Sequence, residues 1–111
     1  MNLVIQLANE GMGRGDEVLG KRLMNTFLHV LTEASIQPNA IVLFNSGVKL
    51  ACEGSAVLDE LNELEQKGIT ILACGTCLNH FELSKKIKVG RESNMVEITE
   101  AMINADRIVP L

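Results

Sequence analysis

Short apolar runs alternate with amphipathic stretches along the chain. Runs of strand length cover residues 3–8, 40–44 and 69–73, and a shorter run covers 107–109. The run at 40–44, Ala-Ile-Val-Leu-Phe, has no polar position, as expected of a strand that is covered on both faces of a sheet. The pattern therefore predicts four strands separated by helical segments.

The longest amphipathic stretch predicts a helix over about residues 17–34. Four residues that recur at every fourth position share one face of this helix: Leu19, Leu23, Phe27 and Leu31. Four more apolar residues widen the face: Val18, Met24, Leu28 and Val30. A stripe this wide is typical of a helix that packs against more than one layer, so the pattern also indicates a contact between subunits.

Three further helices are expected. One covers about 55–67, with Gly68 as its C-terminal stop, and a short one covers 78–87. Asn94 opens the last helix, because Glu97 follows three positions later in a capping-box arrangement. The apolar faces of the first and last of these helices comprise Val57, Leu58, Leu61 and Leu64, and Met95, Ile98, Met102 and Ala105.

This order of elements is a βαβ series, which right-handed crossovers wind into a mostly parallel sheet with helices on both faces. In such sheets, ligands and reactive groups gather at the carboxyl ends of the strands. We therefore expect the segments 11–16, 45–52 and 74–77 to share one edge of the sheet. The length of 111 residues fits a single domain, residues 1–111, with an aliphatic core of its own.

Composition and charge argue against several partner classes. A net charge of −4 and only three aromatic residues, all Phe, argue against binding to nucleic acid or to a membrane surface. No stretch reaches the roughly 18 apolar residues of a membrane span, and the N-terminus lacks the basic region and cleavage site of a signal peptide. Three cysteines are too few, and odd in number, for a secreted disulfide framework. We therefore expect a cytoplasmic protein with free thiols.

The strongest chemical candidates are the two cysteines of Cys74-Gly75-Thr76-Cys77. Cys74 ends a predicted buried strand where a helix begins, and a helix N-terminus favours the thiolate that attacks sulfur. Gly75 removes a side chain beside it, so that a second backbone or a substrate can approach closely. Cys77 lies one helical turn on, within reach of Cys74. The pair can form a disulfide, or one thiol can displace a sulfur atom held on the other.

Three kinds of site contain such a pair. A structural zinc site needs four ligands, and Cys52, His29 and His80 do not form a second pair with zinc-like spacing, so no metal is expected. The residue types also fit a thioredoxin-like redox pair. Thioredoxin-like domains carry that pair after an early strand, however, whereas here it follows the third predicted strand. The remaining interpretation is an acceptor thiol for sulfane sulfur with a second, resolving thiol.

Weaker candidates lie on the other two segments of the same edge. The glycine-rich turn with Gly13, Arg14 and Gly15 has neither dinucleotide-binding nor Walker spacing, but it could bind an anion. Asn45 and Lys49 on the second segment could contribute to that anion or substrate site, and a lysine near the thiol would lower its pKa. Cys52 on the same segment is a further thiol that more often packs than reacts. No cofactor-binding pattern is present.

Several motifs together resemble the DsrE-like domain of YedF-type selenium-metabolism proteins. They run nearly end to end: Gly-Met-Gly-Arg-Gly-Asp at 11–16 with Leu19-Gly20, Phe-Asn-Ser-Gly-Val-Lys-Leu at 44–50, Cys-Gly-Thr-Cys-Leu at 74–78, Val89-Gly90 and Asn94-Met95. Cys52 lies outside the pattern. YedF-type proteins often carry an N-terminal TusA-like domain, which residues 1–111 do not include, so we expect either a stand-alone form or a piece of a longer protein.

The resemblance has implications for fold and function. The wider DsrE/DsrF/TusD sulfur-relay family implies a three-layer αβα sandwich with a mostly parallel five-stranded sheet and flavodoxin-like winding, and commonly a homo-oligomer. Its sulfur-carrying members hold a persulfide on a cysteine at a strand end, which matches Cys74, whereas Cys77 belongs to the YedF-type pattern. The expected partners are sulfur or selenium donor and acceptor proteins, among them a TusA-like carrier.

The sequence thus favours a sulfurtransferase-like sulfur or selenium relay with a persulfide on Cys74 and Cys77 as the resolving thiol. Two alternatives stay open. One is a non-enzymatic module of the same fold that binds a small anion or a partner, and the other is a dithiol redox protein.

Overall fold

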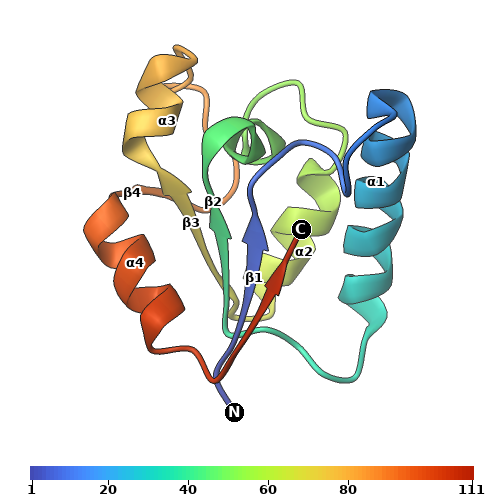
Figure 1. The fold of residues 1–111 in the computed structure, drawn as a ribbon, viewed down its shortest axis with the longest axis vertical. Coiled ribbons are helices and arrows are strands. Elements are labelled where there is room, and N and C mark those ends of the chain that lie inside the picture. The colour runs from blue at the N-terminus through green and yellow to red at the C-terminus, as the bar shows by residue number, and fades with distance from the viewer.

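A computed structural model describes all residues from 1 to 111. Its five strands form one parallel sheet in the order β4-β3-β2-β1-β5 (Figure 1). The strands are β1 (Leu3–Leu7), β2 (Ala40–Leu43), β3 (Thr70–Cys74), β4 (Arg91–Ser93) and β5 (Arg107–Pro110). The helices are α1 (Glu17–Glu33), η1 (Asn45–Ala51, a 3₁₀ helix), α2 (Leu58–Gln66), α3 (Gly75–His80) and α4 (Met95–Ile103).

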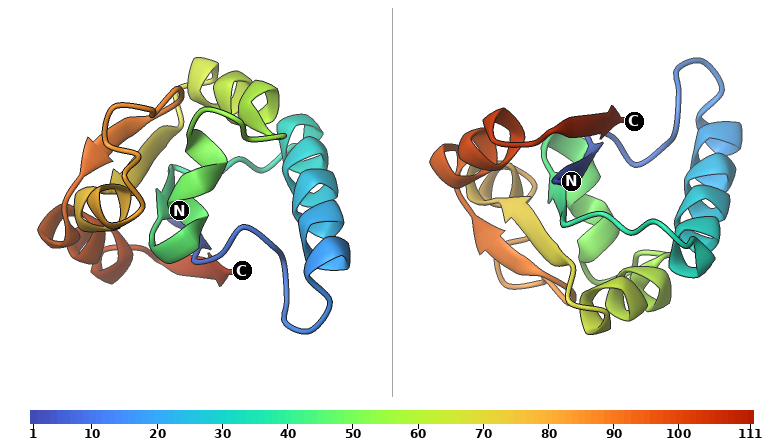
Figure 2. Two further views of the ribbon diagram at one scale, coloured as in Figure 1. Left: turned by 90° about the horizontal axis from the view of Figure 1, so that it is seen from above. Right: turned by 90° about the horizontal axis from the view of Figure 1, so that it is seen from below.

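The layers follow from the crossovers. β1 to β4 step in one direction across the sheet, and α4 then carries the chain back to place β5 beside β1. Figure 2 shows α1 and α2 on one face and α4 on the other, so the α/β class and the three layers are confirmed. The strand order differs from the 2-1-3-4-5 order of flavodoxin, because the single change of direction follows the fourth strand here and the second strand there.

The core is aliphatic, as the composition predicts. All four residues of β2 are buried, which confirms a strand covered on both faces. In adjacent strands Ile5, Ile41 and Ile71 lie in register, and each is at most 2% exposed. This buried row fixes the strand ends at one level and thereby aligns the loops that follow them.

The structure corrects the predicted face of α1. Leu19, Leu23, Val18 and Val30 are 43–81% exposed, whereas Met24 and Leu28 are fully buried. The helix is turned this way because Gly20 lies directly against the loop after β1, where its carbonyl oxygen accepts the N–H of Met12 at 2.9 Å. The glycine that this close approach requires is Gly11 in the loop, where a Cβ would lie 3.1 Å from the Gly20 carbonyl carbon, and hydrophobic periodicity alone does not reveal such a contact.

Three other local predictions need correction. The short helix expected at 78–87 ends at His80, since Glu82 adopts a left-handed conformation with φ of 58°, and the N–H of Leu83 bonds to the carbonyl of Leu78 in a Schellman-type stop. The segment 45–52, expected at the sheet edge without a helix, begins with the helix η1. Strand β4 has no apolar run, and Met95 is 46% exposed rather than buried on α4.

The predicted cap at Asn94 is confirmed, and Asp16 also caps a helix. Asp16 accepts the N–H of Leu19 at 2.8 Å at the start of α1, and Asn94 accepts the N–H of Glu97 at 2.8 Å at the start of α4. Side-chain oxygens at these positions satisfy amides that have no partner within the helix. No helix in the structure is both long and apolar enough to cross a membrane.

Candidate functional site

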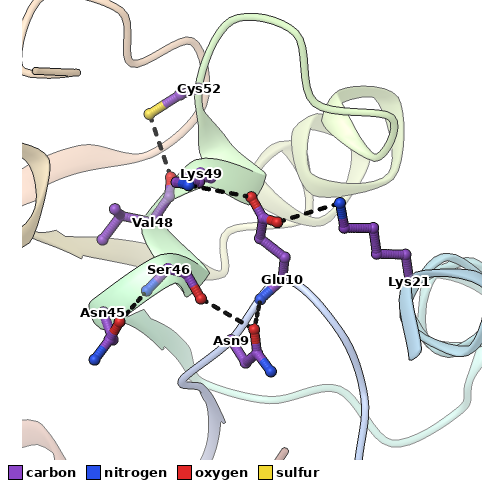
Figure 3. Close-up of polar contacts among 8 residues, drawn as sticks. All are labelled: Asn9, Glu10, Lys21, Asn45, Ser46, Val48, Lys49 and Cys52. Carbon is purple, nitrogen blue, oxygen red and sulfur yellow. Dashed lines mark hydrogen bonds and ion pairs between the residues drawn. The ribbon is translucent and has the colours of Figure 1, made fainter. Parts of the chain in front are cut away.

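Three strand ends meet at the carboxyl edge of the sheet, as predicted. After β1 and β2, the Ser46 hydroxyl donates to Asn9 Oδ1 at 3.0 Å (Figure 3). After β2 and β3, the backbone N–H of Asn45 donates to Cys77 Sγ at 3.1 Å. The loop that begins at Asn45 is therefore bonded to both of its neighbours, and the Cys74–Cys77 segment forms one end of this row.

The two thiols of that segment differ in exposure. Cys74 is the last residue of β3 and the N-terminal flanking residue of α3, and it is only 1% exposed. Cys77 lies one turn into α3 and is partly exposed. Both are free thiols, and Cys74 is close enough to raise the pKa of the Cys77 thiol. Solvent, or an incoming sulfur compound, therefore reaches Cys77 before Cys74.

Several neighbours act on the ionisation of Cys77. Desolvation raises the pKa of its thiol, and the hydrogen bond and charge of Cys74 raise the pKa further, whereas the N–H from Asn45 acts in the opposite direction. The net effect is a pKa above the ordinary value, so the protonated form dominates at neutral pH. The Asn45 amide is the one contact on the thiol that favours its thiolate.

The backbone conformation of Asn45 directs its amide towards the Cys77 thiol. Asn45 has φ of 50°, a left-handed conformation that asparagine adopts more readily than most residues. Its own Oδ1 accepts the N–H of Ser46 at 2.8 Å, which holds the turn (Figure 3). Two residues later, a Cβ on Gly47 would stand 2.1 Å from the carbonyl oxygen of Leu7. Only glycine at 47 lets the turn sit this close to β1.

Gly75 confirms the close approach expected beside Cys74. A Cβ at this position would lie 2.8 Å from the carbonyl oxygen of Ser93 in β4, so the second backbone is the edge strand. Ser93 Oγ is in turn hydrogen-bonded to Glu97, whose carboxylate receives two N–H bonds from Arg91. These bonds to Arg91 and Ser93 lower the pKa of Glu97 to about 2, so the carboxylate stays charged over the physiological range.

The weaker candidates are distributed over the edge rather than gathered at the thiols. Asn45 alone contacts Cys77. Lys49 lies 3.8 Å from Glu10 and 4.5 Å from the centre of the Phe81 ring. Gly13, Arg14 and Gly15 line a separate cavity of about 350 Å³ that contains neither Cys74 nor Cys77.

That second cavity is a poor anion site by charge. Its acidic lining residues, Glu10, Asp16 and Glu17, outnumber the two basic ones, Arg14 and Lys21. An anion there would meet a net negative lining, although the glycine-rich turn itself has the left-handed backbone expected of it, with φ of 82° at Gly13 and 115° at Gly15. The role of this turn in binding stays a prediction.

Cys52 is held apart from the thiol pair. It is 1% exposed, and its Sγ donates to the carbonyl oxygen of Val48 at 3.2 Å (Figure 3). Desolvation raises the pKa of this thiol. The residue also forms an isolated backbone bridge with Ile87, which makes packing its evident role. No group of three or more His, Cys, Asp or Glu side chains lies close enough to hold a metal ion.

Sequence reasoning missed Asn9, Glu10 and Ser46. Each lies within three residues of a strand end, and Asn9 accepts both from Ser46 and from the N–H of Glu10 at 2.7 Å. Asparagine directly after an apolar run was the available signal, because its side chain commonly bonds to the backbone of a turn. Glu10 bridges Lys21 and Lys49, a pairing that depends on tertiary structure.

The model of the DsrE/DsrF-like family matches residues 4–111. The chain belongs to the DsrE/DsrF-like family. This confirms the wider family resemblance on which the five-stranded sheet was expected. No curated protein sequence matches the chain.

Solved structures share the whole fold of this DsrE/DsrF-like chain. The ychN protein from E. coli aligns with a TM-score of 0.68 at 16% identity over the full length of both chains. MTH1491 of Methanobacterium thermoautotrophicum, a protein of unknown function, aligns at 0.69 and 15% identity over 99% of this chain and 98% of its own. BT1422 of Bacteroides thetaiotaomicron, also of unknown function, aligns at 0.69 and 22% identity over 99% and 94%. At these identities the similarity establishes the fold alone.

Proposed function

We propose that this DsrE/DsrF-like protein carries sulfane sulfur, or selenium in its place, on the Cys74–Cys77 pair. The observation that carries the proposal is the partly exposed Cys77 thiol, which accepts a hydrogen bond from the Asn45 amide and lies one helical turn from the buried Cys74 thiol. This arrangement offers one thiol to a partner and keeps a second in reserve. It reverses the order expected from the sequence, in which Cys74 received the sulfur first.

Loading needs no oxidant. The Cys77 thiolate attacks the outer sulfur of a donor persulfide, so that an S–S bond forms on Cys77 Sγ while the S–S bond of the donor breaks. The donor leaves as a thiolate and takes up the proton that Cys77 has lost. The Asn45 amide stabilises the negative charge on Sγ before the attack.

Unloading has two routes. An acceptor thiolate can take the outer sulfur, which returns Cys77 to its thiol form. Like loading, this transfer involves no net oxidation or reduction of the protein. Alternatively, Cys74 attacks Sγ of Cys77, forms the Cys74–Cys77 disulfide and releases hydrogen sulfide. In that second route the outer sulfur is reduced and the two thiols are oxidised, so an external thiol must restore the pair.

Donor and acceptor are proteins with a sulfur- or selenium-carrying cysteine in this proposal, and a TusA-like carrier is the first to test. The cavity lined by Gly13, Arg14 and Gly15 does not include Cys77, which suits a protein partner that brings its own reactive group to the thiol. A small anion at the thiol would need a cation beside it, whereas Lys49 faces Glu10 and the Phe81 ring.

Intact-mass measurement after exposure to a persulfide donor tests the proposal. The wild type and Cys52→Ser, a matched control at a buried thiol, should gain the mass of one sulfur atom, and Cys77→Ser should not. Cys74→Ser should load and then keep its sulfur longer, because the resolving thiol is gone. An adduct on Cys77→Ser at the wild-type rate would restore Cys74 as first acceptor, and no adduct on any variant would end the relay proposal.

Two free thiols one helical turn apart also favour a second function, that of a dithiol redox protein. The two functions differ in what Cys74→Ser can do. A relay keeps the ability to bind one sulfur atom on Cys77, whereas a redox pair loses its reversible two-electron chemistry entirely. Redox titration of the wild type against a glutathione buffer would measure the reduction potential of the Cys74–Cys77 disulfide. A potential far below that of the cytosolic glutathione pool would indicate a structural disulfide.

We further propose that the relay assembles as a homo-oligomer through the outer face of α1. Val18, Leu19, Leu23 and Val30 leave a large apolar surface on this helix, from 43% exposed at Leu23 to 81% at Val18. Contiguous apolar surface of this kind typically marks an interaction site.

A further inference from the structure

Another cavity, distinct from the one lined by Gly13, Arg14 and Gly15, lies between η1, α1 and the residues that follow α3. Its volume is about 440 Å³, and neither Cys74 nor Cys77 lines it. Four separate parts of the chain contribute its charged side chains, namely Glu10 after β1, Lys21 in α1, Lys49 in η1 and Glu53 after η1. The size falls within the range of small-molecule sites, and the proposed relay makes no use of it.

One part of the cavity has an excess of positive charge. Glu10 Oε2 lies 3.4 Å from Lys21 Nζ, and Glu10 Oε1 lies 3.8 Å from Lys49 Nζ. Figure 3 shows the two ammonium groups converging on this carboxylate from different elements. Two cations thus share one anion at distances longer than good hydrogen bonds. Because each ammonium group has three N–H donors, both lysines keep donors for a further carboxylate beside Glu10.

Another part of the lining carries a free negative charge. Glu53 has no hydrogen-bond or ion-pair partner for its carboxylate. The lining therefore carries two positive and two negative charges, and Glu53 is the one charged lining group without an ion-pair partner. A simple anion would match the lysines and meet repulsion from Glu53, whereas a neutral ligand with separated charges matches both parts.

The rest of the wall is apolar. Leu50, Ala56 and Leu83 line it together with the Phe81 ring, and Lys49 lies over that ring at 4.5 Å. The ring thus borders both the cationic part and the apolar part. A ligand that places a carboxylate on the lysines would direct a short hydrocarbon chain along this wall.

We infer that this cavity binds a small zwitterionic α-amino acid with a short apolar side chain. Its carboxylate lies between Lys21 and Lys49, its ammonium group faces Glu53, and its side chain packs against Phe81 and Leu83. The inference is independent of the thiol pair, so loss of persulfide loading would not affect it.

Three matched probes test this assignment by NMR titration of the full chain. L-leucine carries both charges, 4-methylpentanoate lacks the ammonium group, and isoamylamine lacks the carboxylate. L-leucine should produce saturable shifts of the backbone amides from 49 to 56 and of Phe81, and each truncated probe should bind about tenfold more weakly or worse, since each lost bond involves a charged group. Equal binding of 4-methylpentanoate, or no saturable shift with L-leucine, would overturn the inference.

Two substitutions separate the charges on the protein side. Lys49→Gln should weaken L-leucine at least several-fold without weakening isoamylamine, and Glu53→Gln should weaken L-leucine without weakening 4-methylpentanoate. Lys88→Gln makes the same charge change outside the cavity lining and should leave all three probes unchanged. An equal effect of Lys88→Gln and Lys49→Gln would show that net charge alone controls binding, against the inference.

Discussion

At Cys77, burial and Cys74 favour the protonated thiol, and the Asn45 amide opposes them. Since the net result is a raised pKa, the thiolate fraction should keep growing as the pH rises past the ordinary range of a cysteine. We expect the rate of Cys77 alkylation by iodoacetamide to increase up to and beyond pH 9, the ordinary pKa of the thiol. Mass mapping of the alkylated peptide measures it.

Replacing Cys74 by alanine provides the control for this pH profile. Without the Cys74 hydrogen bond and charge, two of the causes that raise the pKa of Cys77 are lost, so the profile should move to lower pH. An unchanged midpoint in Cys74→Ala would mean that desolvation alone sets the ionisation of Cys77.

The thiol pair was predictable from the sequence, but its geometry was not. Cys74 and Cys77 could be singled out because two cysteines one helical turn apart followed an apolar run. Their exposures could not, since the burial of Cys74 depends on β4, a strand without an apolar pattern. The Asn45 amide was also out of reach, because its direction comes from a left-handed backbone conformation that tertiary contacts select.

Gly75 and Gly20 form a matched pair of glycines on which substitution should act in opposite ways. A Cβ at Gly75 would meet the Ser93 carbonyl oxygen at 2.8 Å, whereas at Gly20 the nearest atom is at 3.4 Å, an ordinary contact. Gly75→Ala should lower the free energy of unfolding by roughly 1–3 kcal/mol through overpacking. Gly20→Ala should change it little or raise it by about 0.5–1 kcal/mol, as helix propensity favours alanine.

Urea denaturation of both variants measures this difference. Equal stability of the two would mean that β4 can move away from α3 at little cost. Gly75→Ala should then also leave the reactivity of Cys77 unchanged, which the alkylation assay can determine.

At the scale of elements, β4 and α4 are joined by the contacts of Glu97 with Arg91 and Ser93. The pKa of Glu97 is about 2 in the folded protein, below the usual value of about 4.3 for an unfolded chain. Ionised Glu97 therefore stabilises the fold at pH values above about 4.3. The contribution should disappear as the pH falls from about 4.3 towards 2. Chemical denaturation across this range should show the loss in the wild type and a weaker one in Glu97→Gln.

Glu100→Gln is the matched control for this pH dependence. Glu100 lies on the same helix, and its carboxylate has no side-chain hydrogen bond or ion pair. Its substitution should leave the acid limb of the stability curve as in the wild type. A Glu97→Gln curve that overlays the wild type would show that the contacts with Arg91 and Ser93 add nothing to the fold.

The element order was largely predictable, and the failures share a cause. Four of the strands, β1, β2, β3 and β5, coincide with apolar runs, so the local pattern was sufficient to predict them. The face of α1 and the end of α3 depend on contacts made elsewhere, at Gly20 against the loop after β1 and at Glu82 in its left-handed conformation. β4, Arg-Glu-Ser, pairs along Leu72, Ala73 and Cys74 through its backbone, which a polar sequence does not reveal.

At the scale of the whole molecule, the apolar outer face of α1 predicts self-association. Leu19→Glu combined with Leu23→Glu should lower the molar mass measured by light scattering to that of a monomer, since two charges would be buried without partners. Both side chains are more than 40% exposed in the isolated chain, so the fold should persist.

The matched control places charges on the opposite face of the sheet. Val96 and Ile103 on α4 are also exposed, at 70% and 76%. Val96→Glu with Ile103→Glu should leave the assembly intact if α1 alone forms the contact. Dissociation by the α4 variant and not by the α1 variant would move the interface to α4.

The position of β5 has a consequence for how the chain folds. β1 is an inner strand, paired with β2 on one side and with β5 on the other, although β5 comes last in the sequence. One edge of the first strand therefore stays unpaired until the last strand is in place. Because this pairing closes a loop of nearly the whole chain, docking of β5 should be a late, slow step of folding. A ribosome-bound chain without residues 107–111 would leave one side of β1 unpaired, an open sheet edge of the kind that chaperones must shield.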